Sequence, residues 1–418
     1  MSIQSEMNKI GENAQTAAFK LKLLPTKKKN DALLEMADAL VANMPQIIEK
    51  NKIDIANAEK DGLPKAKIER LILNESRIND MARGIRDVAT LKDPVGEEVS
   101  MWERPNGLRV GRVRVPLGVV GIIYESRPNV TADVAALCLK SGNAVILRGG
   151  SEAINSNSII ADVLSNAAIN AGIPENSIQL IKNTDREFVR VMLKLNKYID
   201  VIIPRGGAGL IQMVVQNATV PTIETGVGVD SIFVNYDADF EMAKNIIINA
   251  KTQRPAVCNA LDKLLVHEKI KDEFILFIIE EIRKYGVEVR GDDETRKIVP
   301  EVIPATEEDW GTEYLDLIMC VRVVKDIAEA IDIITKYDTK HSEAIITNND
   351  EDSQKFLNEV DAAAVYVNAS TRFTDGGQFG LGAEMGISTQ KLHCRGPFAL
   401  EALTSTKFVV YGSGQIRE

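Results

Sequence analysis

The chain has 418 residues, 45% of them hydrophobic, which is enough for a buried core and for two or three domains. Its formal net charge is −10 and it contains no long basic block, so a nucleic-acid partner is disfavoured, because binding phosphate requires clustered lysine and arginine. The longest apolar runs fall far short of the roughly 20 residues that cross a bilayer. The polar N-terminus lacks the apolar segment of a secretory signal. We therefore expect neither a membrane nor a nucleic acid as partner.

Four cysteines, at positions 138, 258, 320 and 394, are widely spaced and form no CxxC pair. This spacing argues against a disulfide framework and a zinc site and favours a reducing compartment. Cys138 and Cys320 lie in apolar periodic runs, where cysteine behaves as a small hydrophobic residue. The cysteines thus predict a cytoplasmic protein without a bound metal, with two of the four thiols in the core.

The first ninety residues are predicted to be helical, because apolar residues recur there at helical spacing. The clearest stripe consists of Ala32, Leu33, Met36, Ala37, Leu40 and Val41. A segment of different character, Val99–Val115, follows. Within it, Arg112–Val115 alternates polar and apolar side chains, which is typical of a half-exposed strand.

From Pro116 onward, short apolar strands alternate with segments of helix length. The first series has predicted strands at Gly118–Tyr124, Ala144–Leu147, Val201–Ile203 and Ile232–Asn235, and helices at Thr131–Lys140 and Ala153–Ala171. The second has strands at Lys263–His267, Ile318–Val324, Ala344–Thr347 and Ala363–Asn368, with helices ending at Tyr285 and Tyr337. The tail, Lys407–Tyr411, is predicted to be one more strand. This alternation predicts parallel sheets with crossover helices. Two α/β units joined near residue 235 would leave a cleft for a cofactor-dependent site, and a single large sheet is the alternative.

Cys258 differs from the two core cysteines. It lies in a connection, broken by a proline, between a helical segment and a strand, and loops often carry reactive groups. The positive charge of Arg254 would favour its thiolate form. Cys394 has a similar local environment between His393 and Arg395, so local reasoning does not choose between Cys258 and Cys394 as a nucleophile.

Several longer motifs are more specific than any single residue. In chain order they are Val115–Ala153, Pro221–Gly228, Gln253–Val266, Lys336–Ile345 and Thr371–Pro397, and they include the sequences ESRPNV, IETGVG, RPAVCNA and GQFGLGAEMGIS. Through these collinear motifs, nearly the whole chain resembles the γ-glutamyl phosphate reductases (glutamate-5-semialdehyde dehydrogenases). This family belongs to the aldehyde dehydrogenase superfamily and acts in proline biosynthesis.

The resemblance implies an α/β, aldehyde dehydrogenase-like fold with two parallel-sheet domains and a small β flap for oligomerisation. The cofactor-binding domain would comprise residues 1–98 and 116–235, the catalytic domain residues 236–403, and the flap residues 99–115 and 404–418. Exposed β edges invite pairing with another subunit, so a homo-oligomer, either dimer or tetramer, is expected. A complex with the upstream glutamate kinase also stays open, because the acyl phosphate is labile in water.

The resemblance implies that Cys258, in RPAVCNA, is the nucleophile, and it leaves Cys394 a structural role. Asn129 matches the superfamily's oxyanion-hole asparagine, and an amide donor there is worth roughly 3–4 kcal/mol to a tetrahedral intermediate. Asn129 is also a candidate N-cap for the helix Thr131–Lys140. Glu224 matches the superfamily's general-base glutamate. Because an acyl phosphate reductase must not hydrolyse its thioester, we expect Glu224 to line the site.

Reduction of a thioester to an aldehyde requires a hydride donor, yet no GxGxxG follows any predicted strand. The resemblance implies contacts to the cofactor ribose at Arg148 and Ser151. The fixed charge of Arg148 suits a 2′-phosphate and favours NADPH over NADH. Gly206 and Gly207 would let the backbone approach the pyrophosphate at a helix N-terminus, with simple tight turns as the alternative. Glu313 resembles the glutamate that binds the nicotinamide ribose.

The leaving phosphate and the substrate α-carboxylate both require cations, and bidentate arginine is the natural partner of either. Arg127, Arg254 and Arg372 lie in or near the matched motifs and are the predicted substrate-binding residues. The expected reaction is NADPH-dependent reduction of γ-glutamyl phosphate to glutamate 5-semialdehyde and phosphate through a thioester on Cys258. Two alternatives stay open: a hydrolytic semialdehyde dehydrogenase with Glu224 as base, and a catalytically silent, nucleotide-binding partner of glutamate kinase.

The chain departs from the family pattern at two places. ETGVG is followed by Asp230 and Ser231, where many family members carry Cys-His, and this puts any role of that histidine in doubt. Asp338 and Lys340 replace more usual small residues, whereas His341 matches. We expect the loop that contains Asp338 and Lys340 to be more charged than the same loop in the family.

Overall fold

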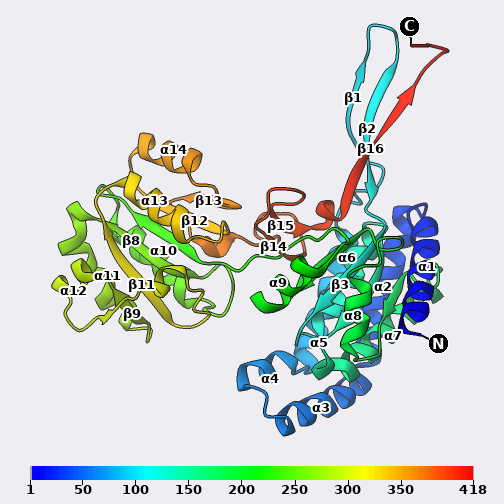
Figure 1. The fold of residues 1–418 in the computed structure, drawn as a ribbon, viewed down its shortest axis with the longest axis horizontal. Coiled ribbons are helices and arrows are strands. Elements are labelled where there is room, and N and C mark those ends of the chain that lie inside the picture. Colours follow the sequence, from blue (N-terminus) through cyan, green and yellow to red (C-terminus); the bar gives the residue numbers. More distant parts are fainter. Residues whose placement is uncertain (1, 418) are drawn as a thin grey trace. The chain divides into compact units, whose positions relative to one another are not determined.

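The computed structural model describes residues 2–417, which divide into two compact units. Unit 1 runs to Thr225 and also contains Gly380–Gly386 and the segment from Phe398 onward; unit 2 comprises Gly226–Phe379 and Ile387–Pro397. Each unit has a parallel sheet of its own (Figure 1). The prediction of parallel sheets with crossover helices is therefore confirmed, and the alternative of one large sheet is wrong.

Unit 1 contains a sheet of four parallel strands in the order β5-β4-β3-β6. The strands are β3 (Val119–Tyr124), β4 (Ala144–Gly149), β5 (Ile178–Leu180) and β6 (Val201–Arg205), and the helices among and after them are α6 (Asn129–Lys140), α7 (Ile154–Asn170), α8 (Arg186–Met192) and α9 (Ala208–Asn217). All residues of β3 and β4 are buried, which explains their continuous apolar runs. The carboxyl ends of such strands are the edge at which open α/β sheets bind ligands.

The predicted N-terminal helices are confirmed. They are α1 (Ile3–Leu21), α2 (Thr26–Ala42), α3 (Met44–Lys60), α4 (Lys65–Leu71) and α5 (Glu75–Thr90). The expected apolar stripe lies on α2, where all its members except Val41 are fully buried. Helix α1 packs on the sheet, with Met7 in one apolar cluster with Val119 and Ile146. None of the helices in residues 2–417 combines the length and apolarity needed to span a bilayer.

Unit 2 contains seven parallel strands in the order β10-β9-β11-β8-β7-β12-β13. The strands are β7 (Asp230–Val234), β8 (Leu261–His267), β9 (Glu288–Gly291), β10 (Ile303–Pro304), β11 (Ile318–Val324), β12 (Ser342–Ile346) and β13 (Ala364–Val367). The helices are α10 (Phe240–Thr252), α11 (Lys271–Arg283), α12 (Asp293–Ile298), α13 (Ile327–Tyr337) and α14 (Asp350–Glu359). Side chains cap four of these helices by accepting from their first-turn N–H groups, namely Asp239, Asp292, Asp326 and Asn349.

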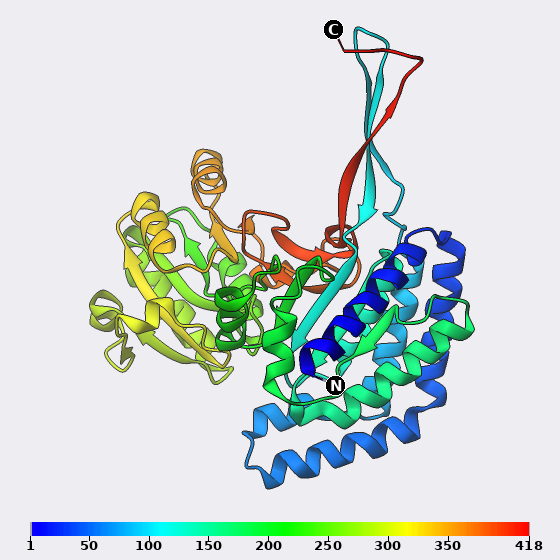
Figure 2. The same cartoon turned by 45° about the vertical axis from the view of Figure 1, so that its right-hand side comes forward.

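A third sheet, antiparallel and in the order β1-β2-β16, belongs to unit 1. Its strands are β1 (Glu98–Glu103), β2 (Arg109–Pro116) and β16 (Thr404–Tyr411), and two short strands, β14 (Glu384–Ser388) and β15 (Gly396–Ala399), precede β16. Figures 1 and 2 show this sheet extending away from the rest of unit 1 as a twisted ribbon. Because the ribbon has little protein beneath it, large apolar side chains stay exposed on it, including Phe408 at 65%.

A buried ion pair joins α10 to β8 in the core of unit 2. Lys251 Nζ lies 3.1 Å from Asp262 Oδ1, and both side chains are almost wholly buried. Burial raises the pKa of Asp262 to about 7 against the attraction of Lys251, and burial likewise lowers the pKa of Lys251. Each charge is therefore tolerated because the other is present.

Lys251→Met is expected to destabilise the fold by about 3–5 kcal/mol, because it leaves the buried Asp262 carboxylate without its ion-pair partner. The matched control is Lys244→Met on the same helix, where the ion-pair partner Glu241 is exposed, with 69% of its side-chain surface accessible. That control should cost less than about 1 kcal/mol. Urea unfolding of both variants measures the difference, and equal costs would contradict the role assigned to the buried pair.

Candidate active site

A cavity of about 850 Å³ lies at the carboxyl ends of the strands of unit 1. Its lining comes from the ends of β3 and β4, from η1 (Ser151–Ala153), and from helices α3, α4, α8 and α9. Of the predicted cofactor contacts, Arg148 and Ser151 line this cavity. The size and position of the cavity fit an extended dinucleotide.

The guanidinium of Arg148 is directed toward main-chain carbonyls. Its Nη2 donates to Thr184 O at 3.0 Å and its Nη1 donates to Gly149 O, whereas its buried Nε has no partner among the described residues. Burial lowers the pKa of Arg148, and the nearby charge of Glu152 opposes that effect. Arg148 therefore stabilises the turn after β4 through its two Nη atoms, and its Nε remains without a partner among the described residues.

The other predicted cofactor glycines, Gly206 and Gly207, lie between β6 and α9. The Gly207 N–H, at the start of α9, donates to Glu125 Oε2 at 3.2 Å. A Cβ on Gly206 would come within 2.7 Å of the same oxygen. The glycines thus allow a carboxylate to approach the helix N-terminus, where the macrodipole favours negative charge. Sequence reasoning missed Glu125, which also lines the cavity.

Asn129 is the first residue of α6, and its side chain does not cap the helix. The N-cap residue is Pro128, so the N-cap interpretation of Asn129 is wrong. Its Nδ2 instead donates to Asp133 Oδ2 at 3.0 Å, one turn further along. Burial raises the pKa of Asp133 to about 6, opposed by the Asn129 hydrogen bond and the charge of Arg205. The i,i+4 spacing could have indicated this pair in the sequence.

Cys258 lies in unit 2 on the loop between α10 and β8 and is partly exposed. Cys138 and Cys320 are fully buried, as predicted, and burial raises the pKa of Cys320 to about 12. Burial also raises the pKa of the partly buried Cys394 to about 11. Cys258 thus combines partial exposure with a place on a loop, whereas Cys138 and Cys320 lie in the core.

The loop that carries Cys258 is fixed by the next residue, Asn259. Asn259 Nδ2 donates to Thr374 O at 3.0 Å, and its main-chain carbonyl accepts from Thr371 Oγ1 at 2.8 Å. On the other side, a Cβ added to Gly228 would overlap the carbonyl group of Cys258. Position 228 therefore requires glycine, which explains part of the TGVG motif.

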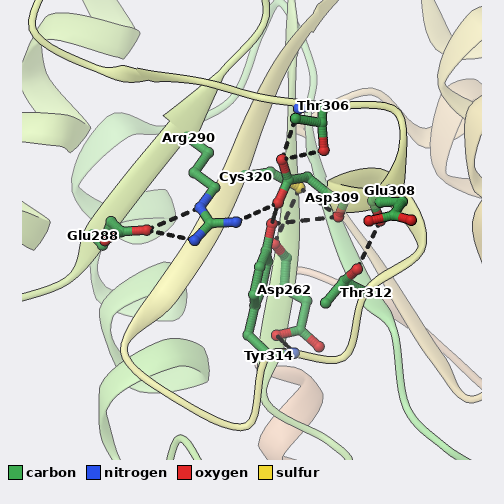
Figure 3. A network of polar contacts seen from close by, with 9 residues as sticks. All are labelled: Asp262, Glu288, Arg290, Thr306, Glu308, Asp309, Thr312, Tyr314 and Cys320. Atoms are coloured by element: carbon green, nitrogen blue, oxygen red, sulfur yellow. Dashed lines mark hydrogen bonds and ion pairs between the residues drawn. The ribbon is translucent and has the colours of Figure 1, made fainter.

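The side chain of Glu313 also contacts Gly228, because its Oε1 accepts from the Gly228 N–H at 3.1 Å. Figure 3 shows how the neighbouring loop is held: Tyr314 OH donates to Asp309 Oδ1 at 2.8 Å, and Arg290 Nη1 lies 2.6 Å from the same oxygen. Unit 2 thus brings the predicted nicotinamide-ribose glutamate to the glycine that contacts Cys258. The sequence separation between Glu313 and Gly228 hides this relationship.

Two of the three predicted substrate arginines, Arg254 and Arg372, lie near Cys258. Arg372 Nε donates to Gln253 Oε1 at 3.0 Å and its Nη1 donates to Asn259 Oδ1. Burial lowers the pKa of Arg372, the charge of Arg254 lowers it further, and Cys258 raises it. The guanidinium of Arg372 therefore lies close to both Arg254 and the Cys258 thiol. Arg127 and Glu224 are partly buried residues of unit 1.

Two of the departures from the family pattern, Asp230 and Ser231, lie in a buried polar group of unit 2, whereas Asp338 is partly buried and Lys340 is exposed. His341 Nδ1 lies 3.3 Å from Asp230 Oδ1 and 2.9 Å from the hydroxyl of Ser342. The Ser231 N–H donates to Glu343 Oε2 at 2.9 Å. Asp230 and His341 therefore lie side by side in this buried group.

Comparison with known proteins supports one family. The model of the aldehyde dehydrogenase family matches residues 2–309. A γ-glutamyl phosphate reductase of Clostridium novyi (strain NT) is 59% identical over 417 residues, which is 100% of both chains. The chain belongs to the γ-glutamyl phosphate reductases, within the aldehyde dehydrogenase family.

Solved structures of the same family share the fold. The crystal structure of a γ-glutamyl phosphate reductase from Thermotoga maritima has a TM-score of 0.97 at 54% identity and covers 99% of this chain and 100% of its own. That from Saccharomyces cerevisiae has a TM-score of 0.54 at 31% identity and covers 100% and 99%, respectively. The aldehyde dehydrogenase-like fold expected from the motifs is therefore confirmed.

The raised pKa of Asp133 predicts a pH dependence of stability. The folded protein holds this proton up to about pH 6, whereas an unfolded aspartate releases it near its ordinary pKa of 3.8. The resulting stabilisation is present below about pH 4 and is lost as the pH rises through about 6. The difference in Tm between Asp133→Asn and the unmodified protein should therefore grow in favour of the variant from pH 4 to pH 7. A difference independent of pH would contradict the assignment.

Proposed function

We propose that the chain reduces γ-glutamyl phosphate to glutamate 5-semialdehyde with release of phosphate, using NADPH, as a step of proline biosynthesis. The principal support is the environment of Cys258: a partly exposed thiol on a fixed loop, with Arg254 and Arg372 close by. Unit 1 holds the cofactor in this proposal, and unit 2 supplies the nucleophile. The names of the relatives, which match the whole chain, support the same substrate.

The Cys258 thiolate attacks the acyl carbon of γ-glutamyl phosphate, a C–S bond forms, and the C–O bond to phosphate breaks. Phosphate leaves with its electron pair, and the glutamyl group stays on the enzyme as a thioester. NADPH, when bound, supplies the hydride that reduces this thioester. The C–S bond of the resulting thiohemiacetal then breaks, which releases the semialdehyde and regenerates the thiolate.

The protein's own groups stabilise the charge that develops on oxygen. The Asn129 amide and the Cys258 N–H are the proposed donors to the oxyanion. One N–H of Asn129 is engaged by Asp133, which fixes the orientation of the amide and leaves its second N–H for the substrate. Glu224 lines the site in this proposal and does not activate water.

The residues of unit 1 fit a nicotinamide dinucleotide. The cavity has the required size, Arg148 keeps a buried Nε without a partner, and the side-chain-free Gly206 and Gly207 precede α9. Arg148 and Ser151 would contact the ribose that carries the 2′-phosphate, the two glycines would approach the pyrophosphate, and Glu313 would bind the nicotinamide ribose. The substrate phosphate and α-carboxylate would be bound by Arg127, Arg254 and Arg372.

Cys258→Ala is expected to lower kcat/KM for semialdehyde oxidation by at least about 1,000-fold, because no other group replaces the nucleophile. Cys394→Ala is the matched control and should stay within about tenfold of the unmodified protein, since the Cys394 thiol resists ionisation. The assay follows NADPH absorbance with glutamate 5-semialdehyde, NADP⁺ and inorganic phosphate.

The same assay separates the proposal from hydrolysis. Without phosphate, the proposed enzyme should form almost no NADPH in steady state, because its thioester has no acceptor. Phosphate-independent turnover, or a fully active Cys258→Ala variant, would contradict the proposed reaction.

We also propose that the β1-β2-β16 sheet mediates homo-oligomerisation. Trp102 and Phe408 meet edge to face on it with ring centroids 6.3 Å apart and are 39% and 65% exposed. Val410 and Tyr411 add further exposed apolar surface on β16, which is an edge strand. A long apolar edge strand favours pairing with another chain.

Phe408→Glu is expected to shift the protein to a smaller assembly, because it introduces a charge into the exposed apolar edge. Ser405→Glu, which places the same charge on an exposed position of the same strand, is the control. Light scattering coupled to size-exclusion chromatography measures the mass. If both variants and the unmodified protein have one mass, this sheet is not the interface.

A further inference from the structure

One wall of the unit 1 cavity is formed by the end of α3 and by α4. Lys60, the last residue of α3, and Lys67, in the first turns of α4, line the cavity and are exposed. Within residues 2–417, neither ammonium group forms a hydrogen bond or an ion pair. This wall therefore presents two cationic side chains with unused hydrogen-bond donors to the cavity.

The turn after β4, on the adjacent wall, carries no excess charge. The Nη atoms of Arg148 donate hydrogen bonds to the carbonyls of Gly149 and Thr184. Glu152 follows in the same turn, and its Oε1 accepts 2.7 Å hydrogen bonds from the N–H and the hydroxyl of Ser126. Because the carboxylate of Glu152 balances the guanidinium of Arg148, a dianionic ligand group there needs cations from another element.

Two buried side chains fix the α3–α4 wall against this turn. Asp54 of α3 accepts from the Ser156 N–H at 2.8 Å and from the Asn155 amide at 2.8 Å, at the start of α7. Asn51 of α3 donates to Leu71 O at 2.7 Å at the end of α4. The helix that ends in Lys60 is thus joined both to the helix that carries Lys67 and to the turn that contains Ser151 and Glu152.

Helices α8 and α9 contribute another part of the cavity lining. This part combines the apolar side chains Val189, Leu210 and Met213, which suit the flat face of a purine, with the cationic Arg186 and Arg190. In the proposed function, Ser151 contacts the ribose that carries the 2′-phosphate. Because Asp54 joins α3 to the helix that follows Ser151, Lys60 and Lys67 lie on the elements next to that contact.

We infer that Lys60 and Lys67 form the subsite for the 2′-phosphate of NADPH and determine the preference for NADPH over NADH. The inference rests on the proposed cofactor and adds the residues that select it. Asp61 and Asp54 line the same wall as Lys60 and Lys67, so its formal charges sum to zero. Asp54 is buried and accepts hydrogen bonds from Asn155 and Ser156, which leaves Asp61 as the carboxylate that opposes the two lysines.

The test measures binding with the full chain and does not depend on catalysis. NADPH and NADH are titrated by the fluorescence of the reduced nicotinamide, with 2′-AMP and 5′-AMP as competitors. Lys60→Ala/Lys67→Ala is compared with the unmodified protein and with Lys65→Ala. Lys65 is an exposed lysine two residues before Lys67 on the same helix and is not part of the cavity lining.

The double variant is expected to bind NADPH about tenfold or more weakly, because two charge-assisted contacts to phosphate are lost. NADH affinity should stay within about twofold, 2′-AMP should lose its advantage over 5′-AMP, and Lys65→Ala should change none of these. Asp61→Asn should tighten NADPH binding and leave NADH binding unchanged.

Equal weakening of NADPH and NADH, or unchanged NADPH affinity, would overturn the subsite while the proposed reaction stands. If the unmodified protein binds neither dinucleotide, the proposed cofactor fails and the subsite fails with it. If Cys258→Ala abolishes activity but the lysine variants show no selectivity change, only the subsite is wrong.

Discussion

The backbone of Gly228 and the carbonyl of Cys258 lie so close that no side chain fits between them. Topology imposes this contact. Strands β7 and β8 are parallel neighbours and pair from their first residues, Asp230 with Leu261, so the segments that precede them enter the sheet side by side. Gly228 and Cys258 are in those two segments. This contact fixes the main chain of Cys258 relative to that of Gly228, and the Gly228 N–H donates to Glu313 Oε1.

The elements that the sequence predicted well are those whose burial is uniform. Strands β3, β4 and β7 are buried along their whole length, so their apolar runs identify them. The short strands β5, β9 and β10 were missed, because two to four residues carry no periodicity and neighbouring strands alone define them. The register of β16 on β2, about 290 residues earlier in the chain, likewise depends on tertiary pairing.

The functional residues likewise divide into those that the local sequence indicates and those that only tertiary contacts reveal. Cys258 and Cys394 have similar local charge in the sequence, and only the surrounding motif favours the former; in the fold, burial of Cys394 raises its pKa to about 11. Asp133 was detectable, because it lies one turn after Asn129. Asn259 and Glu125 were not, because their partners are Thr371, Thr374 and Gly207, which tertiary structure alone brings near.

Around the cavity of unit 1, the protein's own carboxylates already use the backbone donors that usually bind anions. Glu125 takes the Gly207 N–H, Glu152 takes the Ser126 N–H, and Asp54 takes the Ser156 N–H at the start of α7. A glycine-rich fingerprint serves to expose such donors to a pyrophosphate, and its absence agrees with this arrangement. In our proposal, Gly206 and Gly207 allow the backbone to approach the pyrophosphate, and cationic side chains supply the positive charge that the occupied N–H groups do not. We assign that charge to Lys60 and Lys67, because α3 is held to α7 by the same Asp54 that occupies one of the backbone donors.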